Sequence, residues 1–199
     1  MFVSHLRVWE PPAEDLSASP KLEWTEPIFR RRLSQLTKMT VQVVHDLFSD
    51  GTLDKNTKLV FVSFRGELER EFKVNKTLIE EDSILPAAFS LSVFNAAIAQ
   101  ATIALGLKGG YNCVFPSKGN FKDGFLAAAA PVLAGTEENI VFVYADENVP
   151  EYYKEFFDGQ NCPMAFAALL SSQKSDNSVE CKLEDIPRSA REFVQFFKK

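Results

Sequence analysis

The stretch that decides the fold class is residues 139–145, which read NIVFVYA. Its branched and aromatic side chains are apolar at nearly every position, which is typical of a strand buried on both faces. Residues 58–64, KLVFVSF, have the same character, and residues 111–115, YNCVF, form a third predicted strand. A sheet with two apolar faces needs a layer of helices on each side.

Helical patterns separate these strands. In residues 29–48, apolar side chains recur at three- and four-residue spacing and share one helix face. Residues 67–81 form a charged helical connection, residues 89–105 an Ala-rich buried helix preceded by a turn, and residues 121–133 a second Ala-rich helix. This alternation predicts an α/β fold with a largely parallel or mixed sheet covered by helices.

The two ends of the chain are less regular. Residues 1–28 are expected to be an irregular segment, although residues 2–8 alternate loosely and predict an edge strand. Residues 162–170 are an apolar strand or helix, residues 179–183 a last strand, and residues 187–197 a short terminal helix. No repeat or linker divides the chain, so we expect one domain over residues 1–199.

Composition excludes several classes of protein. With 46% hydrophobic and 25% charged residues, the 199-residue chain is neither disordered nor fibrous. Its 22 basic and 27 acidic residues give a net charge of −5, which argues against a general nucleic-acid binder and against an anionic membrane surface as partner. The longest apolar stretch, residues 96–107, is too short to cross a bilayer, and no signal-peptide pattern begins the chain, so we expect a cytoplasmic protein.

The residues that usually carry chemistry are scarce. The three cysteines, Cys113, Cys162 and Cys181, form no CxxC pair, which argues against a zinc ribbon or a disulfide scaffold. The two histidines are His5 and His45, and His45 lies among apolar residues of a predicted helix. No nucleophile elbow, Walker loop or HExxH motif is present. We therefore expect no cofactor and no metal.

Three polar or glycine-rich segments have alternative interpretations. Residues 117–120, SKGN, lie between a strand and a helix, where α/β proteins often place a functional group, but they also read as a solvated turn. The basic residues 30–32 suit either an acidic partner or a solvated turn, and the charge run at residues 67–71 is typical of a solvated helix face. Residues 106–110, GLKGG, follow a helix rather than a strand, which is the wrong order for a phosphate loop.

Several segments in this order resemble a known family. FSLSVFN at residues 89–95, GLKG at residues 106–109 and YADE at residues 144–147 resemble the N-terminal half of a β-ketoacyl synthase, a member of the thiolase-like superfamily. They resemble more closely the chain length factors of aryl polyene clusters. The similarity covers residues 29–147 and leaves residues 148–199 as a divergent part. That group usually reads Ser-Val-His-Asn where this chain has Phe94 in place of the histidine.

The resemblance can be followed to the nucleophile of condensing enzymes. Their active-site Cys lies at the start of the buried helix, because the growing acyl chain is held as a thioester and needs a thiolate at a helix N-terminus. An ungapped register, anchored at Asp123-Gly124, places Lys118 at that position, and a one-residue slip places Ser117 there. Neither is a Cys, and the paired histidines of condensing enzymes belong to a C-terminal half that these residues do not include. The resemblance therefore implies no catalytic residue for Claisen condensation.

The resemblance also implies a mode of action. In ketosynthase dimers, the strand before the nucleophile pairs with the same strand of the partner, which assigns a dimer interface to Tyr111, Asn112, Cys113, Val114 and Phe115. Strand addition supplies main-chain hydrogen bonds, and the flanking apolar faces supply buried area. We expect a heterodimer with a full-length β-ketoacyl-ACP synthase, with acyl carrier protein as a further partner.

Two candidate tunnel residues and two other functions complete the interpretation. Phe121 and Phe125 either wall the partner's acyl tunnel and limit product length, or fill the core. One alternative function is an acyl-thioester hydrolase or acyltransferase that uses Ser90, Ser92 or Ser117, although no histidine base lies near any of them in the sequence. The other is a homodimeric scaffold that binds acyl carrier protein.

Overall fold

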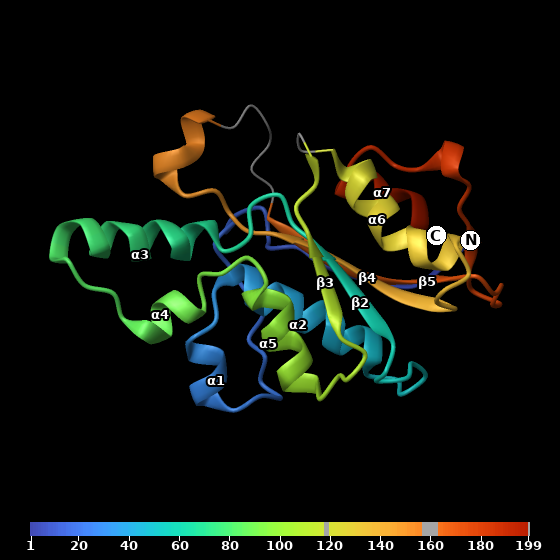
Figure 1. Cartoon of the computed structure of the whole chain (residues 1–199), viewed down its shortest axis with the longest axis horizontal. Coiled ribbons are helices and arrows are strands. Elements are labelled where there is room, and N and C mark those ends of the chain that lie inside the picture. Colours follow the sequence, from blue (N-terminus) through green and yellow to red (C-terminus); the bar gives the residue numbers. More distant parts are fainter. Residues whose placement is uncertain (118–119, 157–162, 199) are drawn as a thin grey trace.

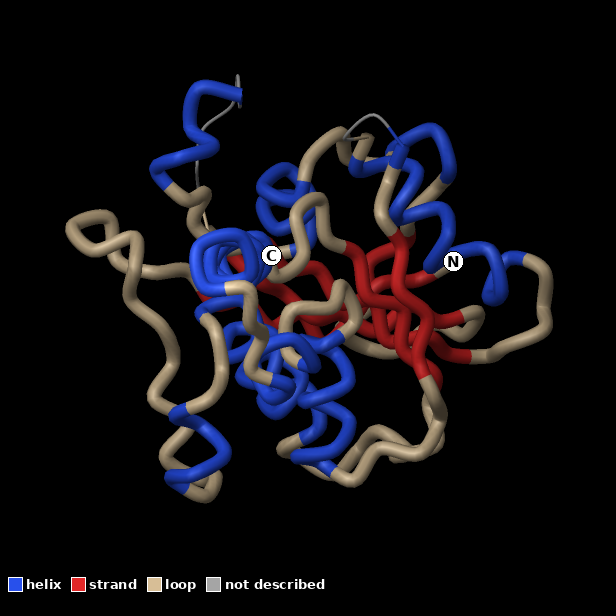
Figure 2. The backbone as a smooth tube through the Cα atoms, turned by 60° about the vertical axis from the view of Figure 1, so that its left-hand side comes forward, coloured by secondary structure: helices blue, strands red, loops and turns tan. Residues whose placement is uncertain are grey.

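The strands form one sheet with helices on both faces (Figures 1 and 2). The computed structural model describes residues 1–117, 120–156 and 163–198. Within them, six strands follow the order β3-β2-β4-β5-β1-β6. The predicted α/β fold with a mixed, helix-covered sheet is confirmed.

The sheet has a parallel and an antiparallel half. Strand β2 pairs in parallel with both β3 and β4, whereas β5 is antiparallel to β4 and β1 is antiparallel to β5 and β6. Residues 162–170, for which strand and helix were both open, contribute β5. The strands are β1 (Phe2–Trp9), β2 (Lys58–Val62), β3 (Tyr111–Val114), β4 (Asn139–Asp146), β5 (Met164–Ser171) and β6 (Val179–Glu180).

The first strand does not lie at the edge that the sequence predicted. β1 lies between β5 and β6, because every residue of β5 is buried and β5 therefore needs a neighbour on each side. The outer strands of the described sheet are β3 and the two-residue β6.

Two predicted helices are divided. Helix α2 begins only after Ser34, whose side chain accepts a hydrogen bond from the backbone N–H of Thr37 and so caps the helix. The predicted helix over residues 89–105 is α4 followed, after a turn, by α5.

No helix of the described residues is long and apolar enough to cross a membrane. The helices are α1 (Pro27–Arg31), α2 (Gln35–Phe48), α3 (Leu68–Glu81), α4 (Pro86–Ser90), α5 (Ala96–Leu105), α6 (Phe121–Leu133), η2 (Glu151–Phe156), η3 (Leu183–Asp185) and α7 (Ala190–Phe197).

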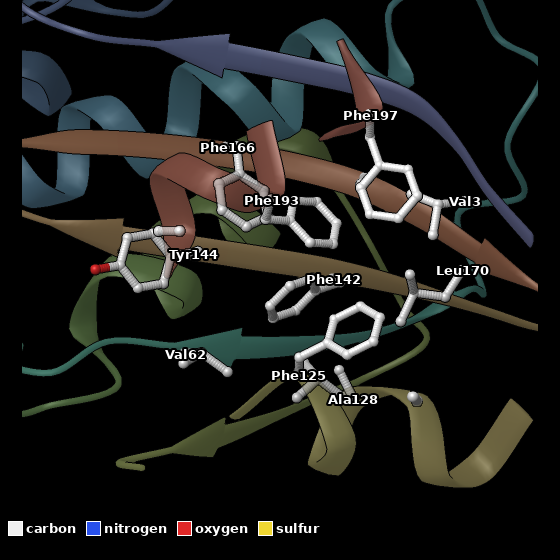
Figure 3. Close-up of a cluster of buried hydrophobic side chains, with 14 of the residues drawn as sticks. Val3, Val62, Phe125, Ala128, Phe142, Tyr144, Phe166, Leu170, Phe193 and Phe197 are labelled. Atoms are coloured by element: carbon white, nitrogen blue, oxygen red, sulfur yellow. The ribbon is translucent and has the colours of Figure 1, made fainter. Parts of the chain in front are cut away.

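A hydrophobic core fills each side of the sheet. One side packs against α2 and α5, and the other packs against α6 and α7. Figure 3 shows the second cluster, in which the rings of Phe142, Phe166 and Phe193 lie together. The Phe166 and Phe193 rings stack with their centroids 4.7 Å apart. Helix α6 approaches β2 closely at Gly124, since a Cβ atom there would lie 2.7 Å from a methyl group of Val62.

Helices α3 and α4 are the least enclosed part of the fold. They extend from the side of the molecule in Figure 1. Val74 is the one fully buried residue of α3. Leu78 and Ile79 of α3 are exposed, as is Leu85, which directly precedes α4.

Candidate functional site

The carboxyl ends of three parallel strands bring three chain segments together. Residues 63–67 follow β2, residues 115–117 follow β3, and residues 146–147 lie at the end of β4. Because β2 lies between β3 and β4, these segments meet along one end of the sheet. Open α/β sheets commonly place functional groups at this end.

Asp146 fixes the turn that follows β2. Its carboxylate accepts hydrogen bonds from the hydroxyls of Ser63 (2.8 Å) and Tyr144 (2.6 Å). The backbone N–H groups of Phe64 and Arg65 also donate to it, each at 3.1 Å. Burial raises the pKa of Asp146, while Arg65 and these donors oppose that rise. This network immobilises the turn, and sequence analysis did not identify it.

Glu147 lies where two helices begin. Its two carboxyl oxygens accept hydrogen bonds from the backbone N–H of Leu36 at the start of α2 (3.3 Å) and of Glu69 at the start of α3 (3.1 Å). Burial, followed by repulsion from the Glu67 carboxylate, raises the pKa of Glu147 to about 8. The carboxyl group therefore joins both helix starts to the end of β4.

The charge run at residues 67–71 is not uniformly solvated. The prediction of a solvated face is wrong for Glu67, which is buried and accepts hydrogen bonds from the hydroxyls of Ser34 (2.7 Å) and Thr37. Arg70 pairs with its second oxygen at 3.3 Å. Burial raises the pKa of Glu67, and these partners oppose the rise. A detectable signal was the position of Glu67 in the segment that connects the buried parallel strand β2 to α3.

The acidic residues at this end of the sheet have hydrogen-bonding partners from the protein itself. In residues 1–117, 120–156 and 163–198, no group of three or more His, Cys, Asp or Glu side chains is placed to hold a metal ion.

The start of α6 is where condensing enzymes carry their nucleophile. Asn120 caps the helix by accepting a hydrogen bond from the backbone N–H of Lys122 (3.1 Å). Ser117 is exposed, and its carbonyl accepts a hydrogen bond from the Asn120 N–H (3.0 Å). Lys118 lies outside the described residues. The assignment of Lys118 or Ser117 to the nucleophile position stays a prediction.

The serines of the hydrolase alternative have local partners. The Ser90 and Ser92 hydroxyls each donate to a backbone carbonyl three residues earlier, at 3.2 and 2.9 Å. His5 bonds to the neighbouring serine of β1, and His45 stacks on Trp24 with ring centroids 4.0 Å apart. Within the described part of the chain, neither histidine is hydrogen-bonded to any of the three candidate serines.

Strand β3 leaves one edge of the sheet open. The Val114 carbonyl accepts a hydrogen bond from the Ser63 N–H, and the carbonyl of Gly110, just before β3, accepts one from the Leu59 N–H. Backbone groups of successive residues in a strand point to alternate sides. The N–H and C=O groups of Tyr111 and Cys113 therefore face away from β2, where the described residues provide no further strand.

The side chains of the edge strand itself are uncharged. No charged residue occurs in residues 111–115. Asn112 is exposed, and Phe115 exposes 63% of its surface. Cys113 is half-buried, and burial raises the pKa of its thiol to about 11, so it is not a thiolate at neutral pH.

The two candidate tunnel residues lie in the core. Phe121 and Phe125 are buried, and both pack against Phe142 and Phe193 with ring centroids 5.5–6.1 Å apart. Figure 3 shows Phe125 between Phe142 of the sheet and Ala128 of its own helix. Their role in an acyl tunnel stays a prediction, because the ring contacts described here are those of core residues.

One sizeable cavity lies away from the β3 edge. It has a volume of about 720 Å³ and is enclosed by α3, α4, the start of α2 and residues 147–154. Leu33, Val74 and Val149 form part of its apolar wall. Lys73, at its rim, pairs with Glu69 at 2.7 Å.

Comparisons with known proteins agree with this geometry. The family described as beta-ketoacyl synthase, N-terminal domain, matches residues 7–194. This match continues beyond residue 147, where the segments quoted above end. None of the curated proteins matches the chain.

The solved structures with similar folds include ketosynthase complexes. A chain of the ketosynthase ApeO in complex with its chain length factor ApeC from Xenorhabdus doucetiae gives a TM-score of 0.73 at 23% identity, covering 86% of this chain and 78% of that one. The ishigamide ketosynthase/chain length factor gives 0.59 at 14% identity, covering 85% and 55%. AntDE:AntF, a type II PKS acyl-carrier protein in complex with its ketosynthase bound to the hexaketide, gives 0.59 at 14% identity, covering 79% and 54%. The chain thus spans about half the length of the latter two, and the predicted thiolase-like half-fold is confirmed.

Proposed function

The chain belongs to the family of β-ketoacyl synthase N-terminal domains, and from this premise we propose that it is a non-catalytic subunit, a chain length factor, that pairs with a full-length β-ketoacyl-ACP synthase. The pair would act in type II fatty acid or polyketide-like synthesis. We assign it to aryl polyene synthesis, which rests on the sequence resemblance.

The observation that carries this proposal is the open edge of β3. Proteins usually protect such an edge with charged residues, Pro or a bulge, because an exposed edge pairs with other chains. Residues 111–115 contain no charge and no Pro. The opposite edge, β6, is only two residues long. A sheet that leaves one edge unprotected is suited to strand addition by a partner.

The chemistry at the start of α6 supports a non-catalytic role. A ketosynthase needs a thiolate there. The sequence has no cysteine between Cys113 and Cys162, so residues 115–121 supply none. Cys113 itself belongs to β3, and its raised pKa keeps the thiol protonated.

The proposed partners are a ketosynthase and, secondarily, an acyl carrier protein. Complexes of a ketosynthase with a chain length factor and with an acyl-carrier protein are among the structures of similar fold, which supports both proposals. The hydrolase alternative has no supporting observation in the described residues. A homodimeric scaffold would use the same β3 edge and is an outcome of the tests below.

The experiment is reconstitution of elongation. The β-ketoacyl synthase encoded nearest to this chain is expressed alone, with the wild-type chain, and with Phe115→Lys. We expect the wild-type chain to restore the solubility and elongation activity of the synthase, and the charge at the β3 edge to abolish that effect. The matched control is Leu183→Lys, which adds the same charge to an exposed leucine of η3. Equal synthase activity with and without the wild-type chain would contradict the proposal.

A further inference from the structure

A row of three aromatic rings runs from the core to the open edge. Phe61 is fully buried in β2, Phe94 is half-buried before α5, and Phe115 is exposed after β3. The Phe94 ring lies 6.2 Å from Phe61 and 6.2 Å from Phe115, centroid to centroid. The contact with Phe115 is edge-on, with the ring planes at 74°, a favoured aromatic geometry.

The middle ring rests on a glycine. Gly66 has φ of +60°, and a Cβ atom built on it would lie 2.7 Å from Cδ2 of Phe94. A side chain at residue 66 is therefore excluded twice, by the backbone conformation and by the ring. The position of the Phe94 ring therefore depends on the absence of a side chain at residue 66.

The glycine in turn lies on the turn held by Asp146. The Ser63 hydroxyl oxygen accepts a hydrogen bond from the Gly66 N–H at 2.8 Å and donates to the buried Asp146 carboxylate at 2.8 Å. Such a charge-assisted, buried network gives the turn one conformation. The ring of Phe94 is thus fixed from below by the turn and from one side by Phe61.

The outer end of the row reaches the surface that strand addition would cover. Asn95, next to Phe94, donates a hydrogen bond to the Tyr111 hydroxyl at 3.1 Å, which ties the α5 start to β3. Phe89 and Val93, on the same segment, are also exposed apolar residues. A positioned, exposed aromatic ring beside an uncharged edge strand has the properties of an interface hot spot.

We propose that Phe94, seated on Gly66, positions Phe115 as the anchor for the partner at the β3 edge. This inference rests on the proposed function, in which the partner at the β3 edge is the ketosynthase. The ketosynthase would contribute an uncharged edge strand and, beside it, an apolar pocket that receives the Phe115 ring. Phe94 is a positioning residue, and Phe115 makes the contact.

The test is a competition for the partner. Wild-type and variant chains with different tags are co-expressed with the ketosynthase, and mass spectrometry measures the share of each in the complex. We expect Phe115→Ala and Phe94→Ala each to lower the captured share at least tenfold, and Phe94→Tyr to restore it. Phe72→Ala is the matched control, since it removes another half-buried ring that stacks on Tyr152 in a different region, and it should leave the share unchanged.

A double variant isolates the role of the glycine. Gly66→Ala should lower the captured share in the wild-type background, because the added methyl group displaces the Phe94 ring. It should lower the share by a smaller factor in the Phe94→Ala background, where the ring is gone and only the strain of a non-glycine residue at a φ of +60° remains. Thermal unfolding of each free chain separates folding losses from binding losses.

The outcomes separate this inference from the proposed function. Failure of the wild-type chain to enter any ketosynthase complex contradicts the proposed function. A wild-type complex that Phe94→Ala or Phe115→Ala joins equally well overturns the positioning role alone. An equal loss from Gly66→Ala in the wild-type and Phe94→Ala backgrounds overturns the role of Gly66 in seating the Phe94 ring.

Discussion

On folding, the carboxyl group of Glu147 moves from water to the place where two helices begin. Both of its oxygens accept backbone hydrogen bonds, which stabilises the ionised form, yet burial and the Glu67 carboxylate raise its pKa to about 8. The unfolded chain has the ordinary value of 4.5. The folded state therefore binds a proton that the unfolded state releases between these two values.

The stability of the protein should depend on pH through this residue. The bound proton contributes fully to the free energy of unfolding below about pH 4.5, and this contribution is lost as pH rises to about 8. The free energy of unfolding should fall by up to ~1.4 kcal/mol per pH unit in that window. In Glu147→Gln, the free energy of unfolding, measured by urea denaturation at a series of pH values, should fall less steeply with pH. The control is Glu151→Gln, which neutralises an exposed carboxylate near the same cavity. Identical slopes in the wild type and in Glu147→Gln would contradict the assignment.

Phe125 tests whether the two buried phenylalanines are core residues. Phe125→Ala removes a fully buried ring that contacts Phe142 and Phe193, and should lower the free energy of unfolding by about 3–5 kcal/mol. Chemical denaturation measures the loss. Phe89→Ala, which truncates an exposed ring, should change stability by about 0.5 kcal/mol or less.

The same variants test the acyl-tunnel prediction. If Phe121 and Phe125 limit product length, Phe121→Ala and Phe125→Ala should lengthen the products of the reconstituted synthase. An unchanged product distribution from folded variants would leave both residues with a packing role only.

Helix α2 shows how one residue can serve two elements. Ser34 caps α2 through the Thr37 N–H and also donates to the buried Glu67 before α3. Ser34→Ala should lower the free energy of unfolding by about 1–2 kcal/mol, because a helix cap and a partner of a buried carboxylate are lost together. Calorimetry should show no comparable loss for Ser49→Ala, which lies at the exposed other end of α2. Equal losses at both ends would contradict the role of Ser34.

The strands were predictable because their pattern is local. Residues 58–64, 111–115 and 139–145 are apolar at successive positions, and each contributes a strand of the parallel half. The neighbours of a strand depend on distant residues. The placement of β1 between β5 and β6 therefore could not follow from residues 2–8 alone.

The site was predictable only in outline, for the same reason. The resemblance located the β3 edge and the start of α6, which are contiguous in sequence. The burial of Glu67 depends on residues 34–37, and the turn after β2 depends on Asp146, some 80 residues later. Local charge pattern suggested a solvated helix face and carried no information about those distant donors.

The whole molecule is a half-fold with one protected and one open edge. Helices cover both faces of the sheet, and the short β6 closes one side, while β3 leaves main-chain donors and acceptors unpaired within the described part of the chain. The chain belongs to the β-ketoacyl synthase N-terminal domain family, and its residues 114–161 contain no cysteine. In the proposed function, this open edge is the surface that pairs with the synthase.

The most direct test of this account is native mass spectrometry of a complex purified through a tag on this chain alone, after co-expression with the neighbouring β-ketoacyl synthase. The account predicts a one-to-one complex of the two chains, which Phe115→Lys dissociates. A monomer or a homodimer of this chain, with no synthase bound, would contradict it.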